Sequence, residues 1–144
     1  MIVLDVNLLL YAYTSSSIQH KKACDWLTGV FSGDELVGLP WQTIHAFLRI
    51  STDKRITADP FPLKRVLGVV QQWLDMPQVR ILVPSERHWA LLQRMLNEGK
   101  VNGPMTTDAQ LAALTLEYGG VLHTADRDFA RFPGLRWVNP LSEA

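Results

Sequence analysis

The chain has 144 residues, and its 14 Lys and Arg balance its 14 Asp and Glu, so the formal net charge is zero. An apolar fraction of 47% is too high for intrinsic disorder and suffices for the core of one domain spanning residues 1–144. The neutral balance excludes a uniformly basic nucleic-acid-binding domain, so any attraction for nucleic acid has to be local.

The first part of the chain alternates short apolar runs with amphipathic stretches. Residues 2–4 are typical of a buried strand, and residues 6–13 favour a helix. A second helix has an apolar stripe at helical spacing, made of Ala23, Trp26, Leu27, Val30 and Phe31. Residues 36–39 predict a second strand, after which Pro40 opens a third helix.

The middle of the chain begins with a loop and continues with the same alternation. Two prolines and several charges predict a loop over residues 52–62. Pro62 suits the first turn of a fourth helix, which has Val66, Val69, Val70, Trp73 and Leu74 on one stripe. Residues 79–83 predict a third strand, and Ser85 is a suitable cap for the fifth helix.

The last part of the chain completes the pattern. Thr106 or Thr107 can cap a sixth helix that ends at the Gly119-Gly120 pair, and residues 121–124 and 135–138 predict two more strands. Strands that are separated by helices predict a parallel sheet with right-handed crossovers. The fold class is therefore α/β.

Cysteine usage and the first residues bear on the compartment. The single cysteine, Cys24, excludes an internal disulfide and a Cys-based zinc cluster, and it reads as a small buried hydrophobe. The first five residues lack the basic region of a signal peptide, and no apolar run approaches the ~20 residues that a membrane span needs. We therefore expect a cytoplasmic protein with no membrane contact.

Four aspartates occur where the predicted strands end or a predicted helix starts. Asp5 ends the first strand, Asp126 and Asp128 follow the fourth strand, and Asp108 lies in the first turn of the sixth helix. Ligands of open parallel sheets bind outside the carboxyl ends of the strands, so these carboxylates converge if strands one and four are neighbours. Carboxylates that close repel one another unless a cation or protons compensate. An oxygen-only donor set favours a hard cation, Mg²⁺ or Mn²⁺.

Each aspartate also has a structural interpretation. Asp5 can cap the helix that begins at Val6, and Asp108 is favoured by the dipole of its own helix. Asp126 and Asp128 can belong to a solvated turn. Taken singly, these interpretations are as good as a metal site or better, and the coincidence of all four positions is what favours the metal site.

Several segments together resemble PIN-domain nucleases, in particular VapC toxins. The segments that resemble the family are Asp5-Val6-Asn7-Leu8-Leu9-Leu10-Tyr11-Ala12, Phe47-Leu48-Arg49-Ile50-Ser51-Thr52, Thr107-Asp108-Ala109-Gln110-Leu111-Ala112-Ala113-Leu114, Thr124-Ala125-Asp126-Arg127-Asp128-Phe129 and Phe132-Pro133-Gly134-Leu135-Arg136-Trp137-Val138-Asn139-Pro140-Leu141. They follow the family's order and span nearly the whole chain, so together they are specific.

The resemblance implies a PIN-like three-layer α/β/α sandwich around a five-stranded parallel sheet. It implies a Mg²⁺-dependent endoribonuclease that hydrolyses RNA phosphodiester bonds and is inhibited by a cognate VapB-type antitoxin whose tail covers the site. Asp5 and Asp108 would be the principal metal ligands, with Asp126 and Asp128 completing the acidic cluster. Asn7 and Thr124 match polar positions that line or brace such sites.

The resemblance also favours a homodimer. Apolar helices early in the chain can supply a dimer face or a groove for an amphipathic antitoxin helix. Trp26, Trp73 and Trp89 fall on apolar stripes, so we interpret them as core or interface residues.

The third helix departs from the family pattern. Many relatives have a glutamate just before the Phe-Leu-Arg segment, where this chain has His45 and Ala46. Ala46 cannot bind a metal, and an imidazole is a poor replacement for a carboxylate toward Mg²⁺. We expect the remaining acids and water to hold the metal, while the number of metal ions stays open.

Each basic side chain has a functional and a structural interpretation, whereas the histidines have a structural one. Arg49 lies on an otherwise apolar helix, which favours a buried or site-facing position where it contacts phosphate or pairs with an acid. Lys54 and Arg55 on the loop, like the arginines beside the acidic turn, can guide RNA locally or remain solvated. The four histidines show no metal-ligand spacing, and we interpret them as structural.

Three other classes compete with a metal-dependent nuclease. Phosphatases with an aspartyl nucleophile need a second aspartate two residues after the first, where this chain has Asn7. A receiver-like or adaptor domain needs paired acids and a late lysine at a strand end, which we do not find. A PIN-fold protein with weakened catalysis that only binds a partner remains open because Ala46 replaces the glutamate.

Overall fold

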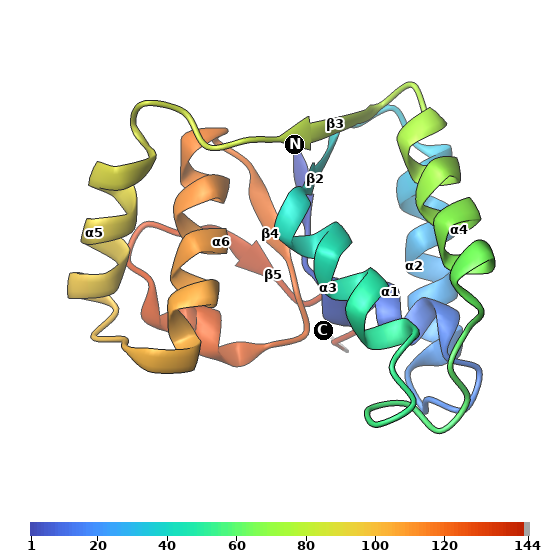
Figure 1. The fold of residues 1–144 in the computed structure, drawn as a ribbon. Coiled ribbons are helices and arrows are strands. Elements are labelled where there is room, and N and C mark those ends of the chain that lie inside the picture. Colours follow the sequence, from blue (N-terminus) through green and yellow to red (C-terminus); the bar gives the residue numbers. More distant parts are fainter. Residues whose placement is uncertain (143–144) are drawn as a thin grey trace.

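The computed structural model describes residues 1–142 as a parallel sheet with helices on both faces (Figure 1). The five strands are β1 (Ile2–Leu4), β2 (Val37–Pro40), β3 (Val79–Leu82), β4 (Val121–His123) and β5 (Trp137–Val138). Their order across the sheet is β3-β2-β1-β4-β5, and every neighbouring pair is parallel. The prediction of an α/β fold with a five-stranded parallel sheet is confirmed. Residues 143 and 144 of the expected domain lie outside the described residues.

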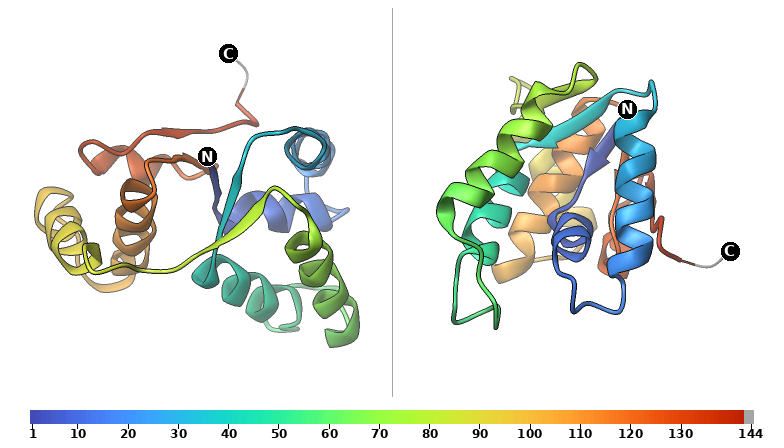
Figure 2. Two further views of the ribbon diagram at one scale, coloured as in Figure 1. Left: turned by 90° about the horizontal axis from the view of Figure 1, so that it is seen from above. Right: turned by 90° about the vertical axis from the view of Figure 1, so that its right-hand side faces the viewer.

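Six α-helices cover the sheet. They are α1 (Val6–Tyr13), α2 (His20–Ser32), α3 (Trp41–Ser51), α4 (Leu63–Asp75), α5 (His88–Glu98) and α6 (Thr106–Glu117). Two short 3₁₀ helices, η1 (Gly103–Met105) and η2 (Arg127–Arg131), precede α6 and follow β4. Helices α5 and α6 lie on one side of the molecule, and α1 to α4 lie on the other (Figures 1 and 2). No helix within residues 1–142 combines the length and apolarity that crossing a bilayer requires.

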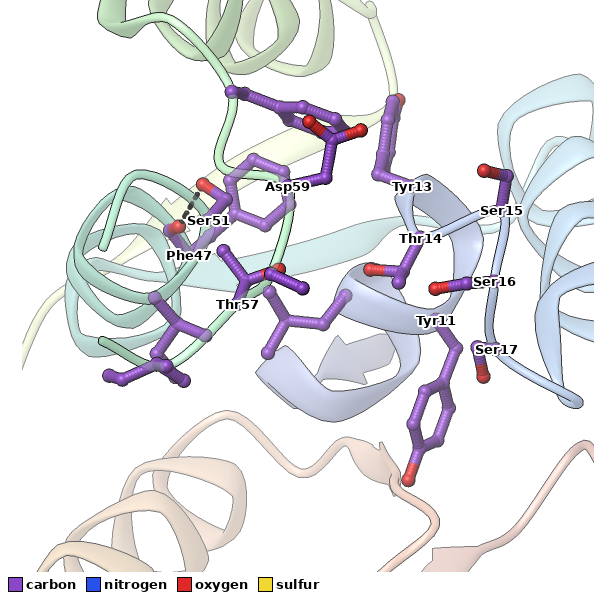
Figure 3. Close-up of a pocket in the computed structure, with 15 residues that line it drawn as sticks. Tyr11, Tyr13, Thr14, Ser15, Ser16, Ser17, Phe47, Ser51, Thr57 and Asp59 are labelled. Carbon is purple, nitrogen blue, oxygen red and sulfur yellow. Dashed lines mark hydrogen bonds between the residues drawn. The ribbon is translucent and has the colours of Figure 1, made fainter. Parts of the chain in front are cut away.

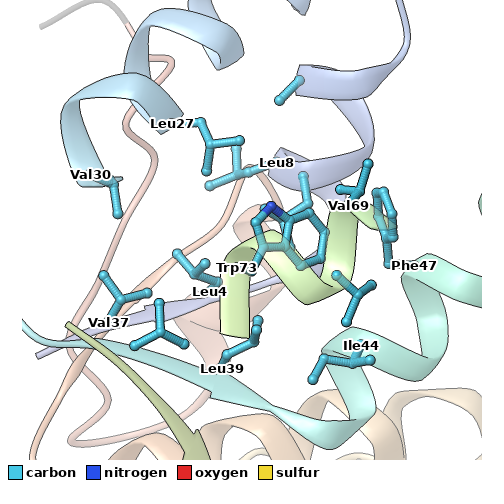
Figure 4. Packing of buried hydrophobic residues seen from close by; sticks show 14 of the residues in the cluster. Leu4, Leu8, Leu27, Val30, Val37, Leu39, Ile44, Phe47, Val69 and Trp73 are labelled. Carbon is cyan, nitrogen blue, oxygen red and sulfur yellow. The ribbon is translucent and has the colours of Figure 1, made fainter. Parts of the chain in front are cut away.

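Alternating side chains of the strands form a hydrophobic core on each face of the sheet. Leu4 packs with α1 to α4 in one core, and Val3 packs with α5 and α6 in the other. The first core contains Trp73, whose indole packs edge to face on Phe47 with the ring centroids 4.7 Å apart (Figure 4). The Trp73 indole N–H also donates to the Tyr13 hydroxyl (3.2 Å), so its polar atom is satisfied in the core.

The helix ends predicted from sequence differ from the structure at two places. Ser85 does not cap α5, because its hydroxyl donates to Glu117 and its helix begins only at His88. The Thr106 hydroxyl donates to the carbonyl of Gly103, so neither threonine caps α6. The predicted end of α6 is confirmed, since the helix stops at Glu117 and Gly119 takes a φ of +63°.

Trp89 does not belong to the core. We interpreted it as a core or interface residue, and its side chain is 65% exposed on α5, so the interface role alone stays a prediction. Within residues 1–142 it therefore contributes little to the core, whereas Trp73 is buried and Trp26 is partly buried.

Candidate active site at the carboxyl edge of the sheet

Asp5 combines a structural role with a position at the carboxyl end of β1. One carboxylate oxygen, Oδ1, accepts the Val6 backbone N–H (2.7 Å), so Asp5 caps α1 as one interpretation predicted. The other, Oδ2, accepts from the Thr124 hydroxyl (2.7 Å) and from the Asn7 amide (3.4 Å). Burial raises the pKa of Asp5, the hydrogen bonds from Thr124 and Val6 oppose that rise, and the charge of Asp126 adds to it.

Asn7 and Thr124 join the ends of β1 and β4, which are neighbours in the sheet. The fully buried Thr124 hydroxyl accepts from the Asn7 amide (3.2 Å) and from the Asp126 backbone N–H (3.0 Å). Asn7 in turn accepts the Ala125 backbone N–H through Oδ1 (3.3 Å). The two residues thus fix the backbone on either side of the carboxylates.

The pKa of Asp108 responds to its burial and to the charges of the other three aspartates. Its pKa is raised to about 6, first by burial and then by the negative charges of Asp126, Asp5 and Asp128, while Arg131 acts in the opposite direction. The sheet order and α6 therefore bring all four predicted carboxylates into one electrostatic field.

Asp126 and Asp128 differ in their surroundings. Asp126 is half-buried and caps η2 by accepting the Asp128 backbone N–H (2.9 Å). Asp128 is exposed, so the interpretation of a solvated turn describes Asp128 better than Asp126. Asp5, Asp108 and Asp126 form the inner part of the acidic cluster, and Asp128 lies at its rim.

The acidic cluster has the donor chemistry of a hard divalent cation site. Within residues 1–142, no three Asp, Glu, His or Cys side chains are already gathered as a closed set of metal ligands. Mg²⁺ is usually held by one or two protein carboxylates and keeps several waters, so a closed set of three is not required. Burial, and after it the charges of the other three aspartates, raise the pKa of Asp108, and a bound cation would favour its ionised form. Asp5 and Asp108, with Asp126, are the residues that fit such an ion.

The first turn of α3 also borders this edge, which we did not predict from the sequence. The Thr43 hydroxyl donates to the carbonyl of Leu4 (2.8 Å), directly before Asp5. The Gln42 amide donates to the carbonyl of Thr107 (3.3 Å), directly before Asp108, and its Oε1 is buried without a partner in the described part of the chain. Both residues follow β2, and the rule that placed the aspartates at strand ends would also have selected them.

Comparisons with known proteins agree with this geometry. The sequence model of the PIN domain family matches residues 2–135. The chain is 38% identical to ribonuclease VapC33 of Mycobacterium tuberculosis over 143 residues, which is 99% of this chain and 100% of the relative. It is 36% identical to ribonuclease VapC37 of the same organism over 140 residues, which is 97% of each chain. The chain belongs to the PIN domain family, among its VapC ribonucleases.

Solved structures support the PIN fold. VapBC2 from Rickettsia felis, bound to a promoter DNA fragment, matches with a TM-score of 0.70 at 15% identity over 96% of this chain and 98% of that one. VapC20 of Mycobacterium tuberculosis, described as a toxin that cleaves the sarcin-ricin loop, matches with a TM-score of 0.67 at 14% identity over 94% and 99%. Membership of the PIN family decides against the phosphatase and receiver-like alternatives.

Arg49 occupies a different place in this PIN domain from the one we predicted. Its side chain is exposed on α3, not buried, and its charge acts on Asp53. Within residues 1–142 no hydrogen bond or ion pair joins its guanidinium to the acidic cluster. Ala46, at the family's glutamate position, is partly buried on the same helix, and His45 is exposed and packs against Trp41.

The remaining histidines of the PIN domain have structural partners. His88 lies 2.7 Å from Glu117, whose pKa is held below its usual value because hydrogen bonds from Ser85 and His88 outweigh the effect of burial. His123 accepts the Trp26 indole N–H (3.1 Å), and burial lowers its pKa. The carboxylate of Glu117 thus binds Ser85 and His88 and takes no part in the acidic cluster.

Cys24 and His20 also act structurally, although their proximity was not predicted. The Cys24 thiol donates to the carbonyl of Ala12 (3.2 Å) and lies 3.5 Å from His20 Nε2. His20 Nδ1 lies 3.0 Å from the carbonyl of Tyr11, so both side chains bind α2 to the main chain of α1.

A largely apolar pocket of about 460 Å³ lies beside the C-terminal end of α1. Phe47 and Ser51 of α3 and Thr57 of the following loop form one side of it, and the turn with Ser15, Ser16 and Ser17 forms another (Figure 3). Its volume falls in the range of ligand pockets. This pocket is separate from the acidic cluster in its lining residues.

Proposed function

We propose that this PIN-domain chain is a metal-dependent endoribonuclease and the toxin of a type II toxin–antitoxin pair. The observation that supports the site is the raised pKa of Asp108 within a field of three other carboxylates at the edge of the sheet. Its relatives at 36–38% identity are named VapC ribonucleases, and the substrate we propose is RNA.

The proposed metal is Mg²⁺, with Mn²⁺ as a substitute, held by Asp5 and Asp108 with Asp126. When bound, such an ion polarises a phosphoryl oxygen and lowers the pKa of a coordinated water. The chain's own residues orient the metal ligands and the attacking water, and they accept the proton of that water. Thr124 and Asn7 fix the Asp5 carboxylate, and Asp126 or Asp128 orients the attacking water and accepts its proton. Water attacks the phosphorus directly, without a covalent protein intermediate; the P–O bond to the leaving ribose oxygen breaks, and that oxygen takes up a proton from solvent.

Ionisation of Asp108 sets the pH at which the proposed site is competent. Below a pH of about 6 the Asp108 carboxyl is protonated and is a poor metal ligand, so we expect activity on the alkaline side of this value. Asp5 has a raised pKa as well, which acts in the same direction.

The proposed protein partner is an antitoxin of the VapB type, because several proteins that share the fold were solved as VapBC complexes. We propose that an amphipathic segment of the antitoxin occupies the pocket beside α1, where aromatic side chains meet a row of hydroxyls (Figure 3). A homodimer is the proposed assembly of the toxin.

The test is cleavage of single-stranded RNA by the purified chain, with Mg²⁺ and with excess EDTA. We expect Mg²⁺-dependent cleavage that EDTA abolishes and that Asp5→Asn and Asp108→Asn reduce at least a hundredfold. Asp34→Asn, an exposed carboxylate after α2, is the matched control and should retain full activity. Near wild-type cleavage by either site variant would contradict the assignment of the metal site.

A catalytically weakened binding protein is the second candidate, because Ala46 replaces the family's glutamate. It predicts antitoxin binding without RNA cleavage at any Mg²⁺ or Mn²⁺ concentration. The same assay, repeated with the partner present, separates the two candidates.

A further inference from the structure

An open, positively charged depression lies at the C-terminal end of α3. It has a volume of about 500 Å³ and is lined by Arg49, Thr52, Asp53, Lys54, Arg55 and Pro60. Three cationic side chains and one carboxylate thus line a single concavity on a chain whose net charge is zero. We call it the basic depression.

Two of the three cations in the basic depression are uncommitted. Arg55 is held by Asp53, with Nε 3.2 Å from Oδ1 and Nη2 3.2 Å from Oδ2, and this hydrogen bonding lowers the pKa of Asp53. Arg49 and Lys54 form no hydrogen bond or ion pair with any other residue of the described chain and both are exposed, although the charge of Arg49 also acts on Asp53. The depression therefore presents two charges that are free to meet an anion.

Helix α3 connects the basic depression to the acidic cluster. Gln42, Ala46 and Arg49 are spaced i, i+4 and i+7, which places them within roughly 60° of one another around the helix. The Gln42 end of this stripe contacts the carbonyl of Thr107 beside Asp108, and the Arg49 end opens into the depression. The seven residues between the ends correspond to about 10 Å along the axis.

We propose that the basic depression binds a backbone phosphate of the RNA strand, about three nucleotides from the scissile phosphate. The distance follows from about 10 Å of helix and a rise of about 3.4 Å per nucleotide in a stacked strand. This inference rests on the proposed function of the acidic cluster.

The negative charge of the acidic cluster explains why a phosphate-binding site is useful at some distance from it. Four aspartates at the site repel a polyanion and are only partly offset by Arg131, so cations farther from the site can add attraction for RNA. Lys and Arg that neutralise phosphates release counterions, which supplies affinity that weakens with salt. The lining carries three cationic side chains and one carboxylate and no aromatic residue, so its charge is complementary to a phosphate.

The first experiment measures binding of a labelled single-stranded RNA in EDTA, by fluorescence anisotropy at a series of KCl concentrations. Arg49→Gln and Lys54→Gln should each weaken binding by about two- to fivefold, as expected for exposed charge pairs. Each phosphate contact that is lost should reduce the slope of log K against log [KCl] by about 0.7. Arg87→Gln, an exposed cation before α5, is the matched control and should change neither quantity.

The second experiment locates the subsite along the strand. RNAs with one neutral methylphosphonate linkage at successive positions are cleaved by the wild-type chain and by the Arg49→Gln, Lys54→Gln double variant. We expect wild-type cleavage to fall several-fold when the neutral linkage lies about three nucleotides from the cut, and the double variant to be insensitive to that linkage.

The outcomes are distinguishable. Unchanged affinity and salt slope in both variants would overturn the basic depression as a phosphate site, even if the wild-type chain cleaves RNA. Variants that lose only antitoxin affinity would overturn it too, because the surface would then belong to the protein partner. Absence of cleavage by the wild-type chain would contradict the proposed function, and the binding experiment in EDTA would still decide the phosphate contact.

Discussion

Replacing Asp108 by asparagine should stabilise the metal-free protein while removing its activity. Because burial and three neighbouring carboxylates raise the pKa of Asp108 from 3.8 to about 6, its ionised form is unfavourable in the folded state. This difference corresponds to roughly 3 kcal/mol for a fully shielded group. Asp108 is partly exposed, so screening by solvent reduces the expected gain to about 1–2 kcal/mol.

The sign of this effect follows from linkage. At a pH well above 6 the carboxyl is ionised in both states, and its cost in the folded state is fully present. Between pH 6 and pH 4 the folded state takes up a proton first, so the cost declines, and below about pH 4 it vanishes. The advantage of Asp108→Asn over the wild type should therefore be largest at pH 7.5 and about a third as large at pH 4.5.

Thermal unfolding followed by circular dichroism measures this difference. In EDTA at pH 7.5 the melting temperature of Asp108→Asn should exceed that of the wild type by about 3–8 °C. Saturating Mg²⁺ should raise the melting temperature of the wild type but leave that of the variant nearly unchanged, because the ion stabilises only a protein that binds it. Asp34→Asn should melt with the wild type. A lower melting temperature for Asp108→Asn in EDTA at pH 7.5 would refute the idea that the carboxylates repel one another.

Three further predictions concern the same edge of the sheet. At sub-saturating Mg²⁺, kcat/KM for RNA should fall about tenfold between pH 7 and pH 5, as Asp108 with a pKa of about 6 takes up its proton; a flat profile would show that no carboxyl of raised pKa is required. Thr124→Val should lower the free energy of unfolding by about 1–3 kcal/mol, because it removes a buried donor to the Asp5 carboxylate and a buried acceptor for the Asp126 backbone N–H. Urea titration measures this change, and Thr124→Ser, which keeps the hydroxyl, is the control. Ala46→Glu should lower the Mg²⁺ concentration for half-maximal cleavage several-fold by adding a carboxylate at the family's glutamate position, and an unchanged metal dependence would show that this face of α3 does not reach the ion.

The sequence was sufficient for the fold because local signals and global topology agree in this chain. Apolar runs flanked by helices predicted five parallel strands, and each exists within one or two residues of its predicted range. The position of Asp5, Asp108 and Asp126 at strand or helix ends followed from the same pattern. What the pattern could not supply was the neighbour relation of β1 and β4, which the sequence left as a condition and which the structure shows to bring these carboxylates together.

Side-chain errors arose where a local preference lost to a tertiary contact. Ser85 has the chemistry of a helix cap, but the Glu117 carboxylate, which is 2% exposed, binds its hydroxyl instead. Trp89 satisfies helical spacing, yet it lies about 120° around α5 from Met95, the one buried residue of that helix, and so faces solvent. The bonds of Gln42 and Thr43 to other elements join residues far apart in sequence, and hydrophobic periodicity does not report them.

The loop over residues 52–62 is a single chain with a different surface on each side. Ile56 and Phe61 contribute to the apolar pocket beside α1, whereas Lys54 and Arg55 contribute to the basic depression. If an occupant of either surface favours one conformation of these few peptide units over another, the two binding equilibria are thermodynamically linked. An antitoxin segment in the pocket could then weaken RNA binding without overlapping the RNA, and RNA would weaken antitoxin binding by the same factor. Competition between the two ligands would in that case not require a shared site.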